Sequence, residues 1–164
     1  MKYQTEDIRR KDHLMDEHRA LELLRQCEYG ILSMTGDDGL PYGIPVNYVW
    51  EGQESLYIHC APEGKKLRSI SLHPEVSFCI IGKVHLLPDK FSTERESVVL
   101  KGIAHIGLSD EEKLHALHLL VDKLSPDFQE AGYRYAEKAL HRVEIIRIDC
   151  QAFAGKSKVL KTNM

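Results

Sequence analysis

Apolar and polar positions alternate with a period of two over several short stretches of this chain, with helical spacing between some of them. Apolar residues repeat at helical spacing after Asp16, a favourable N-cap, so we expect a helix that ends near Gly30. A second helix follows Ser109, which forms a capping box with Glu112. The period-two pattern predicts six strands, at 31–35, 42–50, 56–60, 76–81, 97–106 and 143–150.

Six strands with few helices between them favour a mainly β fold, an antiparallel barrel with peripheral helices. Further helices are expected at 65–73 and 133–140. Residues 1–13 lack an apolar rhythm and are predicted to be a flexible arm, while 14–164 are predicted to form a single domain. The segment 82–96 is expected to be irregular and functional, mobile or part of an interface.

Composition narrows the class of protein. The formal net charge of −3 gives no electrostatic support for broad nucleic-acid binding. The four cysteines are scattered without a CxxC pair, which is typical of reduced thiols. The first residues are polar and charged, and no apolar run has membrane-spanning length. We therefore expect a cytoplasmic protein without membrane contact.

The segment LYIHCAPEGKKLRSI (56–70) carries the strongest chemical signal. It predicts a strand, a turn and a helix whose first turn holds Lys65 and Lys66. Two ordinary solvated lysines are the simpler interpretation. However, cations at a helix N-terminus oppose the helix dipole, and a bound anion would offset that repulsion. We therefore predict a phosphate site here, with His59 and Cys60 beside it.

Other polar residues leave two interpretations open. His59 is either a partly buried structural histidine or a pocket residue that donates a hydrogen bond or relays a proton. Asn47 either faces solvent or directs its amide at the edge of a heterocyclic ring. His115 and His118, with Glu111 nearby, share helical spacing, but the other ligands of a closed metal site are missing, so solvated histidines are favoured and no metal is expected.

The motifs of several enzyme classes are absent. The sequence contains no GxSxG, Walker loop, GxGxxG or HExxH. Any difficult chemistry would therefore belong to a cofactor.

In order along the chain, the segments YGILSM, GDDGLPYGIPVNYVW, LYIHCAPEGKKLRSI, PEVSFCIIG and FSTERESVVLKGIAHI resemble a known family. They are similar to the pyridoxamine 5′-phosphate oxidase-like FMN-binding split barrels, and more closely to the branch that contains the 5-nitroimidazole resistance proteins. The resemblance runs from about residue 9 to 158. It implies a six-stranded antiparallel split β-barrel and a homodimer with flavin bound between the subunits.

The resemblance also assigns roles to residues. The isoalloxazine ring would be bordered by Pro45, Val46, Asn47 and Tyr48. The ring or ribityl chain would be lined by His59, Cys60 and Ala61, and the phosphate end by Lys65, Lys66 and Leu67. The other subunit would close the site with Ser92, Thr93, Glu96 and Ser97, and a C-terminal motif near the cofactor is matched by Gly155 and Lys156. His59 is the predicted catalytic residue.

We therefore expect a flavoprotein that binds FMN, with FAD as an alternative, and reduces small electron-poor compounds such as nitroaromatics. A non-catalytic flavin-binding or storage protein is one alternative, and a barrel that uses haem or a deazaflavin is another. The second basic cluster that would bind a substrate phosphate is not found, so vitamin B6 oxidation is not expected.

Overall fold

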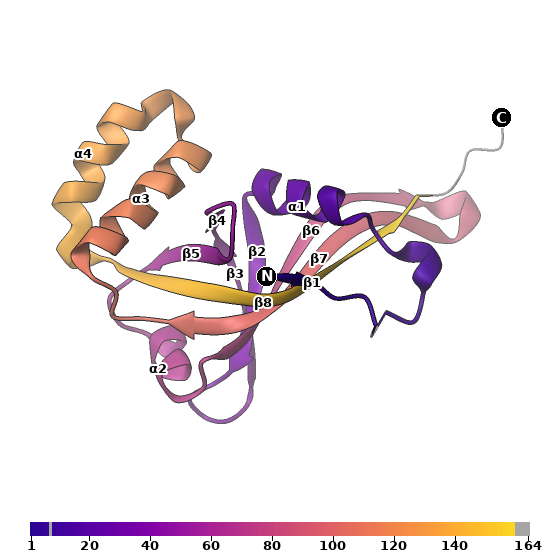
Figure 1. The fold of residues 1–164 in the computed structure, drawn as a ribbon, viewed down its shortest axis with the longest axis horizontal. Coiled ribbons are helices and arrows are strands. Elements are labelled where there is room, and N and C mark those ends of the chain that lie inside the picture. Colours follow the sequence, from indigo (N-terminus) through magenta and orange to yellow (C-terminus); the bar gives the residue numbers. More distant parts are fainter. Residues whose placement is uncertain (7, 160–164) are drawn as a thin grey trace.

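In the computed structural model, which describes residues 1–6 and 8–159, eight strands form one sheet and four α-helices lie around it (Figure 1). The strands are β1 (Lys2–Tyr3), β2 (Tyr29–Thr35), β3 (Pro41–Asn47), β4 (Val49–Trp50), β5 (Ser55–Cys60), β6 (Glu75–Leu87), β7 (Ser92–His105) and β8 (Glu144–Lys158). The helices are α1 (Glu17–Gln26), α2 (Lys65–Leu72), α3 (Asp110–Leu124) and α4 (Gln129–Ala139).

The sheet closes on itself at Tyr48. Its order is β3-β2-β6-β7-β8-β5-β4, with antiparallel neighbours throughout, and β1 pairs parallel to β8. β3 and β4 stand at opposite ends of this order, yet only Tyr48 separates them in the chain. A flat sheet of seven strands would hold its two edges roughly 30 Å apart, whereas a single intervening residue lets the ends of β3 and β4 lie at most about 8 Å apart. The two ends therefore meet, and the predicted antiparallel barrel is confirmed.

The strand count is eight, so the predicted count of six was wrong. The expected strand 42–50 divides at Tyr48, whose fully buried side chain turns into the core between β3 and β4. Lys2–Tyr3 also pairs with Ala152 and Phe153 of β8, although this segment was predicted to be part of a flexible arm.

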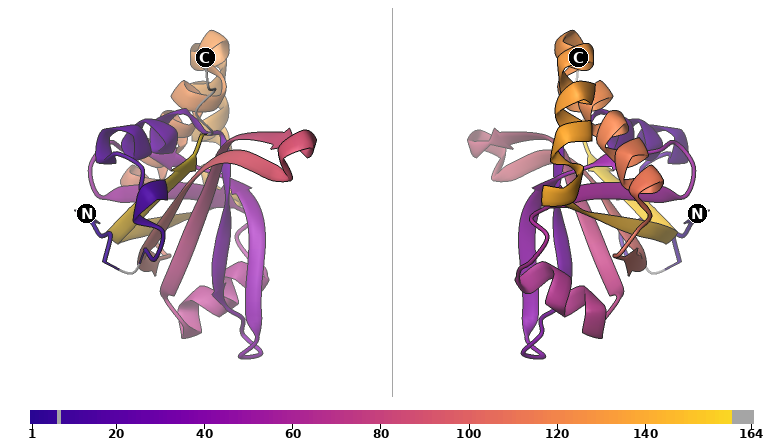
Figure 2. Two further views of the ribbon diagram at one scale, coloured as in Figure 1. Left: turned by 90° about the vertical axis from the view of Figure 1, so that its right-hand side faces the viewer. Right: turned by 90° about the vertical axis from the view of Figure 1, so that its left-hand side faces the viewer.

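The segment 82–96 is also more regular than predicted. β6 and β7 continue their ladder as a hairpin whose register shifts between Ile81 and Val84. The hairpin turns at Pro88–Lys90, and Phe91 has a left-handed backbone with φ 46°. Figure 2 shows this hairpin projecting beyond the barrel. Because most of its outer residues are exposed on both faces, the hydrophobic alternation that predicts a strand is absent there.

Two hydrophobic clusters hold the elements together. The larger fills the barrel under α1 and includes Leu24, Leu32 and Phe78. The smaller lies between the α3–α4 pair and the sheet and includes Tyr57 and Ile145. β5 is thus buried on both faces until His59, where the exposed part of the strand begins. This change places the end of β5 at the surface beside α2 and the α3–α4 pair.

Candidate functional site

The turn after β5 forms an uncapped helix N-terminus, as the sequence predicts. Gly64 is the N-cap of α2 with φ 141°, a conformation that favours glycine, and no side chain caps the helix. A Cβ placed on Gly64 would meet nothing within 4 Å. The first N–H groups of a helix have no partner within the helix, and no side chain caps those of α2, so this turn suits an anion.

The two lysines of this turn have different surroundings. Lys65 Nζ lies 2.8 Å from the Asp38 carboxylate and 3.9 Å from that of Asp37. It also lies 5.1 Å from the centroid of the Tyr42 ring. Lys66 makes no ion pair or hydrogen bond with residues 1–6 or 8–159. Lys66 is therefore the cation of this pair that remains available to a ligand.

Lys66 acts electrostatically on the end of β5. Partial burial lowers the pKa of His59, and the charge of Lys66 lowers it further. Burial raises the pKa of the Cys60 thiol, while Lys66 opposes that rise. His59 is thus mainly neutral at pH 7, and Cys60 is a thiol. Ala61 is exposed beside them, and Leu67 packs at the edge of the barrel core.

The end of β3 approaches this turn through its contact with β5. Pro45 and Asn47 are exposed, while Val46 is partly buried on the opposite face of the strand. Asn47 Nδ2 donates a 3.0 Å hydrogen bond to the carbonyl oxygen of Glu28. In this amide orientation, Asn47 Oδ1 has no hydrogen-bond partner among the described residues and can accept from a ligand.

Tyr48 has a structural position. It has no solvent-exposed surface, and its hydroxyl donates a 2.8 Å hydrogen bond to the carbonyl oxygen of Leu24. Its ring packs edge-on against Phe78. In this conformation Tyr48 supports β3 from inside the core and offers no surface to a ligand.

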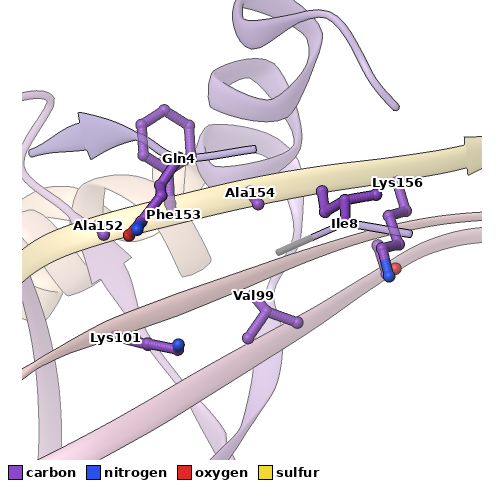
Figure 3. Close-up of a pocket in the computed structure, with 9 residues that line it drawn as sticks. Gln4, Ile8, Val99, Lys101, Ala152, Phe153, Ala154 and Lys156 are labelled. Carbon is purple, nitrogen blue, oxygen red and sulfur yellow. The ribbon is translucent and has the colours of Figure 1, made fainter. Parts of the chain in front are cut away.

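A second set of predicted site residues lies along β7 and β8. Ser97 pairs with Lys156, and both line a recess of about 260 Å³. Figure 3 shows this recess with Lys156 at its edge. Gly155 is buried under α1, where an added Cβ would lie 2.9 Å from Ala20 Cβ and 3.0 Å from Met15 Cβ. Gly155 thus permits the close approach of α1 and β8.

The remaining residues of this set are engaged within the chain. Arg19 of α1 donates two 2.9 Å hydrogen bonds to the Glu96 carboxylate. Ser92 Oγ accepts a hydrogen bond from the Lys158 ammonium, and Thr93 lies in the β6–β7 hairpin. These contacts stabilise the projecting end of the sheet.

The two sets lie far apart in one chain. In Figure 1, α2 lies below the sheet in the left half of the view, whereas the β6–β7 hairpin with the end of β8 extends to the right-hand end. One copy of the chain therefore does not bring the lysines of α2 together with Ser92 and Thr93.

The histidines of α3 do not form a metal site. Among the residues that the structure describes, no group of three or more His, Cys, Asp or Glu side chains could hold a metal ion. His118 packs on the Tyr133 ring at 4.3 Å between centroids, and His115 is exposed.

Within the residues that the structure describes, no helix combines the length and apolar character that a bilayer crossing needs.

Sequence reasoning missed a groove next to His59. It has a volume of about 590 Å³ and lies between α3, α4 and the end of β5. His59, Cys60 and Ala61 form one of its walls. The helical pattern around residues 114–139 contains no local signal for a groove, because its walls meet only in the folded chain.

A family model described as pyridoxamine 5′-phosphate oxidase matches residues 16–157. The chain belongs to this family. Its fold is the flavin-binding split barrel, as the resemblance of the five sequence segments implied. Family membership establishes the fold, whereas the reaction depends on the residues of the site.

Solved structures share this fold. A candidate 5-nitroimidazole antibiotic resistance protein from Bacteroides thetaiotaomicron superposes with a TM-score of 0.75 at 24% identity, over 88% of this chain and 86% of that one. An FAD- and haem-binding protein from Mycobacterium smegmatis gives 0.71 at 19% identity, over 91% and 75%. HutZ, a haem storage protein from Vibrio cholerae, gives 0.64 at 17% identity, over 85% and 94%. A search of curated proteins finds no match.

Proposed function

We propose that this protein binds a flavin, preferentially FMN, with its phosphate at the N-terminus of α2. The observation that carries the proposal is Lys66, an unpaired cation at an uncapped helix start, next to His59 and Cys60. A phosphate would accept hydrogen bonds from the free N–H groups of α2 and pair with Lys66. Open space in front of Gly64 leaves room for such a group.

The proposed site requires a second copy of the chain. The β6–β7 hairpin, which holds Ser92 and Thr93, lies away from α2 in one chain. A homodimer can bring this hairpin to the partner's cofactor, together with Ser97 and Lys156, which pair on β7 and β8. The exposed apolar residues of the projecting sheet support this assembly, because Ile81, Val84, Leu86 and Val99 would be shielded from water. Each dimer would then hold two equivalent flavins.

The chain's residues would position the cofactor and control protons near it. A bound flavin supplies hydride or electron transfer to an acceptor. Asn47 Oδ1 is free to accept a hydrogen bond from a ring N–H. His59 is neutral near pH 7, so it can donate or accept one hydrogen bond without bringing a charge. Lys66 would hold the phosphate end.

We further propose that the protein is a reductase of small electron-poor compounds such as 5-nitroimidazoles. The fold shared with the candidate Bacteroides thetaiotaomicron resistance protein supports this class of acceptor. A two-electron reduction of a nitro group would consume two electrons and two protons and release water, leaving a nitroso group. The electrons would come from a reduced nicotinamide cofactor, and the exposed His59 is placed to pass a proton.

The visible spectrum of the purified protein tests the cofactor. A flavin gives two bands in the blue and near-ultraviolet, and mass analysis of the released compound separates FMN from FAD. One intense Soret band would instead support haem. Haem is the second candidate because the Mycobacterium smegmatis and Vibrio cholerae proteins of the same fold are described as haem-binding and haem-storage proteins. Colourless protein that takes up no added FMN would refute the proposal. NADPH turnover with and without a nitroimidazole separates a reductase from a flavin-storage protein.

A further inference from the structure

The groove between α3, α4 and the end of β5 is open and mainly apolar. It measures about 590 Å³, which is enough for a molecule with two fused aromatic rings. Its floor is formed by Leu117, Leu120 and Ala136, which belong to the smaller hydrophobic cluster. Such a lining favours an apolar ligand body over a sugar or a nucleotide phosphate.

Two aromatic side chains stand at the groove without being buried. Phe128 is 70% exposed and Tyr135 is 69% exposed, and both line the groove. Two exposed aromatic rings that border one apolar groove form a contiguous apolar surface, which is typical of ligand-binding grooves. A flat ligand in the groove would cover part of both rings.

The charge of the groove has one sign. Arg142 lines it, and no Asp or Glu does among the described residues. Arg142 also makes no ion pair or hydrogen bond within 1–6 and 8–159. An unpaired guanidinium in a groove without carboxylates favours an anionic group on the ligand.

We propose that this groove binds an organic anion whose aromatic body is about the size of two fused rings. The apolar body would lie on the floor and along Phe128 and Tyr135, and the anionic group would pair with Arg142. The assignment of this ligand as the acceptor rests on the proposed function, because His59 and Cys60 form the wall shared with the proposed flavin site. The groove is then the acceptor-binding part of that site.

A pair of naphthalene probes tests the charge. Anilinonaphthalene sulfonate is an apolar anion, and phenylnaphthylamine is a neutral analogue of similar size. We expect Arg142→Gln to weaken the sulfonate roughly three- to tenfold at low salt, since the guanidinium is exposed, and to leave the neutral probe unchanged. Lys138→Gln is the matched control, because Lys138 is exposed on α4 outside the groove. Equal effects of both variants on the sulfonate would overturn the proposal.

Aromatic variants test the location. Phe128→Ser and Tyr135→Ser remove mostly exposed rings and spare the core, so both should fold. Each should weaken both probes by at least about threefold. Leu40→Ser is the control, since Leu40 is 64% exposed at the β2–β3 turn outside the groove. Unchanged probe binding in both aromatic variants would show that the probes bind elsewhere and would refute the proposal.

Flavin absorbance on the same samples separates the two proposals. If FMN does not bind but Arg142→Gln selectively weakens the sulfonate, the groove is a binding site and the proposed function fails. If FMN binds but the affinity of the probes is unchanged in the Arg142, Phe128 and Tyr135 variants, the groove proposal fails and the flavin proposal stands. Competition between the sulfonate and a nitroaromatic acid in the FMN-loaded protein supports the acceptor role, and its absence contradicts that role.

Discussion

Lys65 Nζ lies 2.8 Å from the Asp38 carboxylate of the β2–β3 turn, so the helix-start lysine nearest to Gly64 already has a partner. Its neighbour Lys66 has none among the described residues. The sequence pattern predicted that both lysines bind a phosphate. The structure separates them into one that joins α2 to the β2–β3 hairpin and one that is free to bind.

We therefore expect Lys66→Ala to weaken FMN binding by about tenfold or more, the effect of losing one charge-assisted contact. Riboflavin, which lacks the phosphate, should bind nearly as before. Lys65→Ala is the matched control and should have a smaller effect on FMN. Fluorescence quenching titrations of both flavins provide the measurement. An equal loss of FMN and riboflavin binding in Lys66→Ala would contradict the phosphate role.

The Arg19–Glu96 pair predicts a pH-dependent stability. Hydrogen bonds from Arg19 lower the pKa of Glu96, so the contribution of the carboxylate is present above its ordinary pKa and disappears as the pH falls through the lowered value. Glu96→Gln should reduce the free energy of unfolding by about 1 kcal/mol at pH 7. Urea denaturation at pH 7 and at decreasing pH should show that difference shrinking in acid. A difference that is independent of pH would argue against the ion pair.

Lys123 predicts a second pH dependence, of the same sign but at alkaline pH. Its Nζ is buried without a hydrogen-bond partner 3.8 Å from the centroid of the Tyr48 ring, and burial lowers its pKa to about 8. The unfolded chain therefore binds the proton more tightly, and stability rises as the pH goes from about 8 to the ordinary lysine value. Lys123→Met should remove this rise, which we expect to be about 1 kcal/mol after allowing for partial exposure. Denaturation of both proteins across this pH range provides the test.

Gly155 predicts a packing defect. Gly155→Ala would place a Cβ 2.9 Å from Ala20 Cβ and 3.0 Å from Met15 Cβ, forcing α1 away from β8. The free energy of unfolding should fall by about 1–3 kcal/mol. At Gly43 an added Cβ would stand 3.7 Å from its nearest neighbours, so Gly43→Ala is the control and should change stability much less. A stable Gly155→Ala protein that has lost only FMN would instead indicate direct contact with the cofactor.

Local sequence was sufficient for most elements. Asp16 and Ser109 cap α1 and α3 as predicted, because capping depends on neighbouring backbone groups. The strand-turn-helix at 56–70 was also recovered. The β6–β7 hairpin was missed because its outer part has no core to bury, so its pairing leaves no alternation. The division of 42–50 was missed because it follows from closure of the barrel at Tyr48.

The sequence by itself determined the mainly β fold, the helix start at Gly64 and the residues that border it, since these depend on periodicity and on contacts between near neighbours. Only the tertiary structure decided that Asp38 pairs with Lys65, that Gly155 allows α1 to pack closely on β8, and that Arg142 lines a groove beside His59. Each of these contacts joins residues distant in the chain. Their energies depend on how the barrel closes, which no local pattern records.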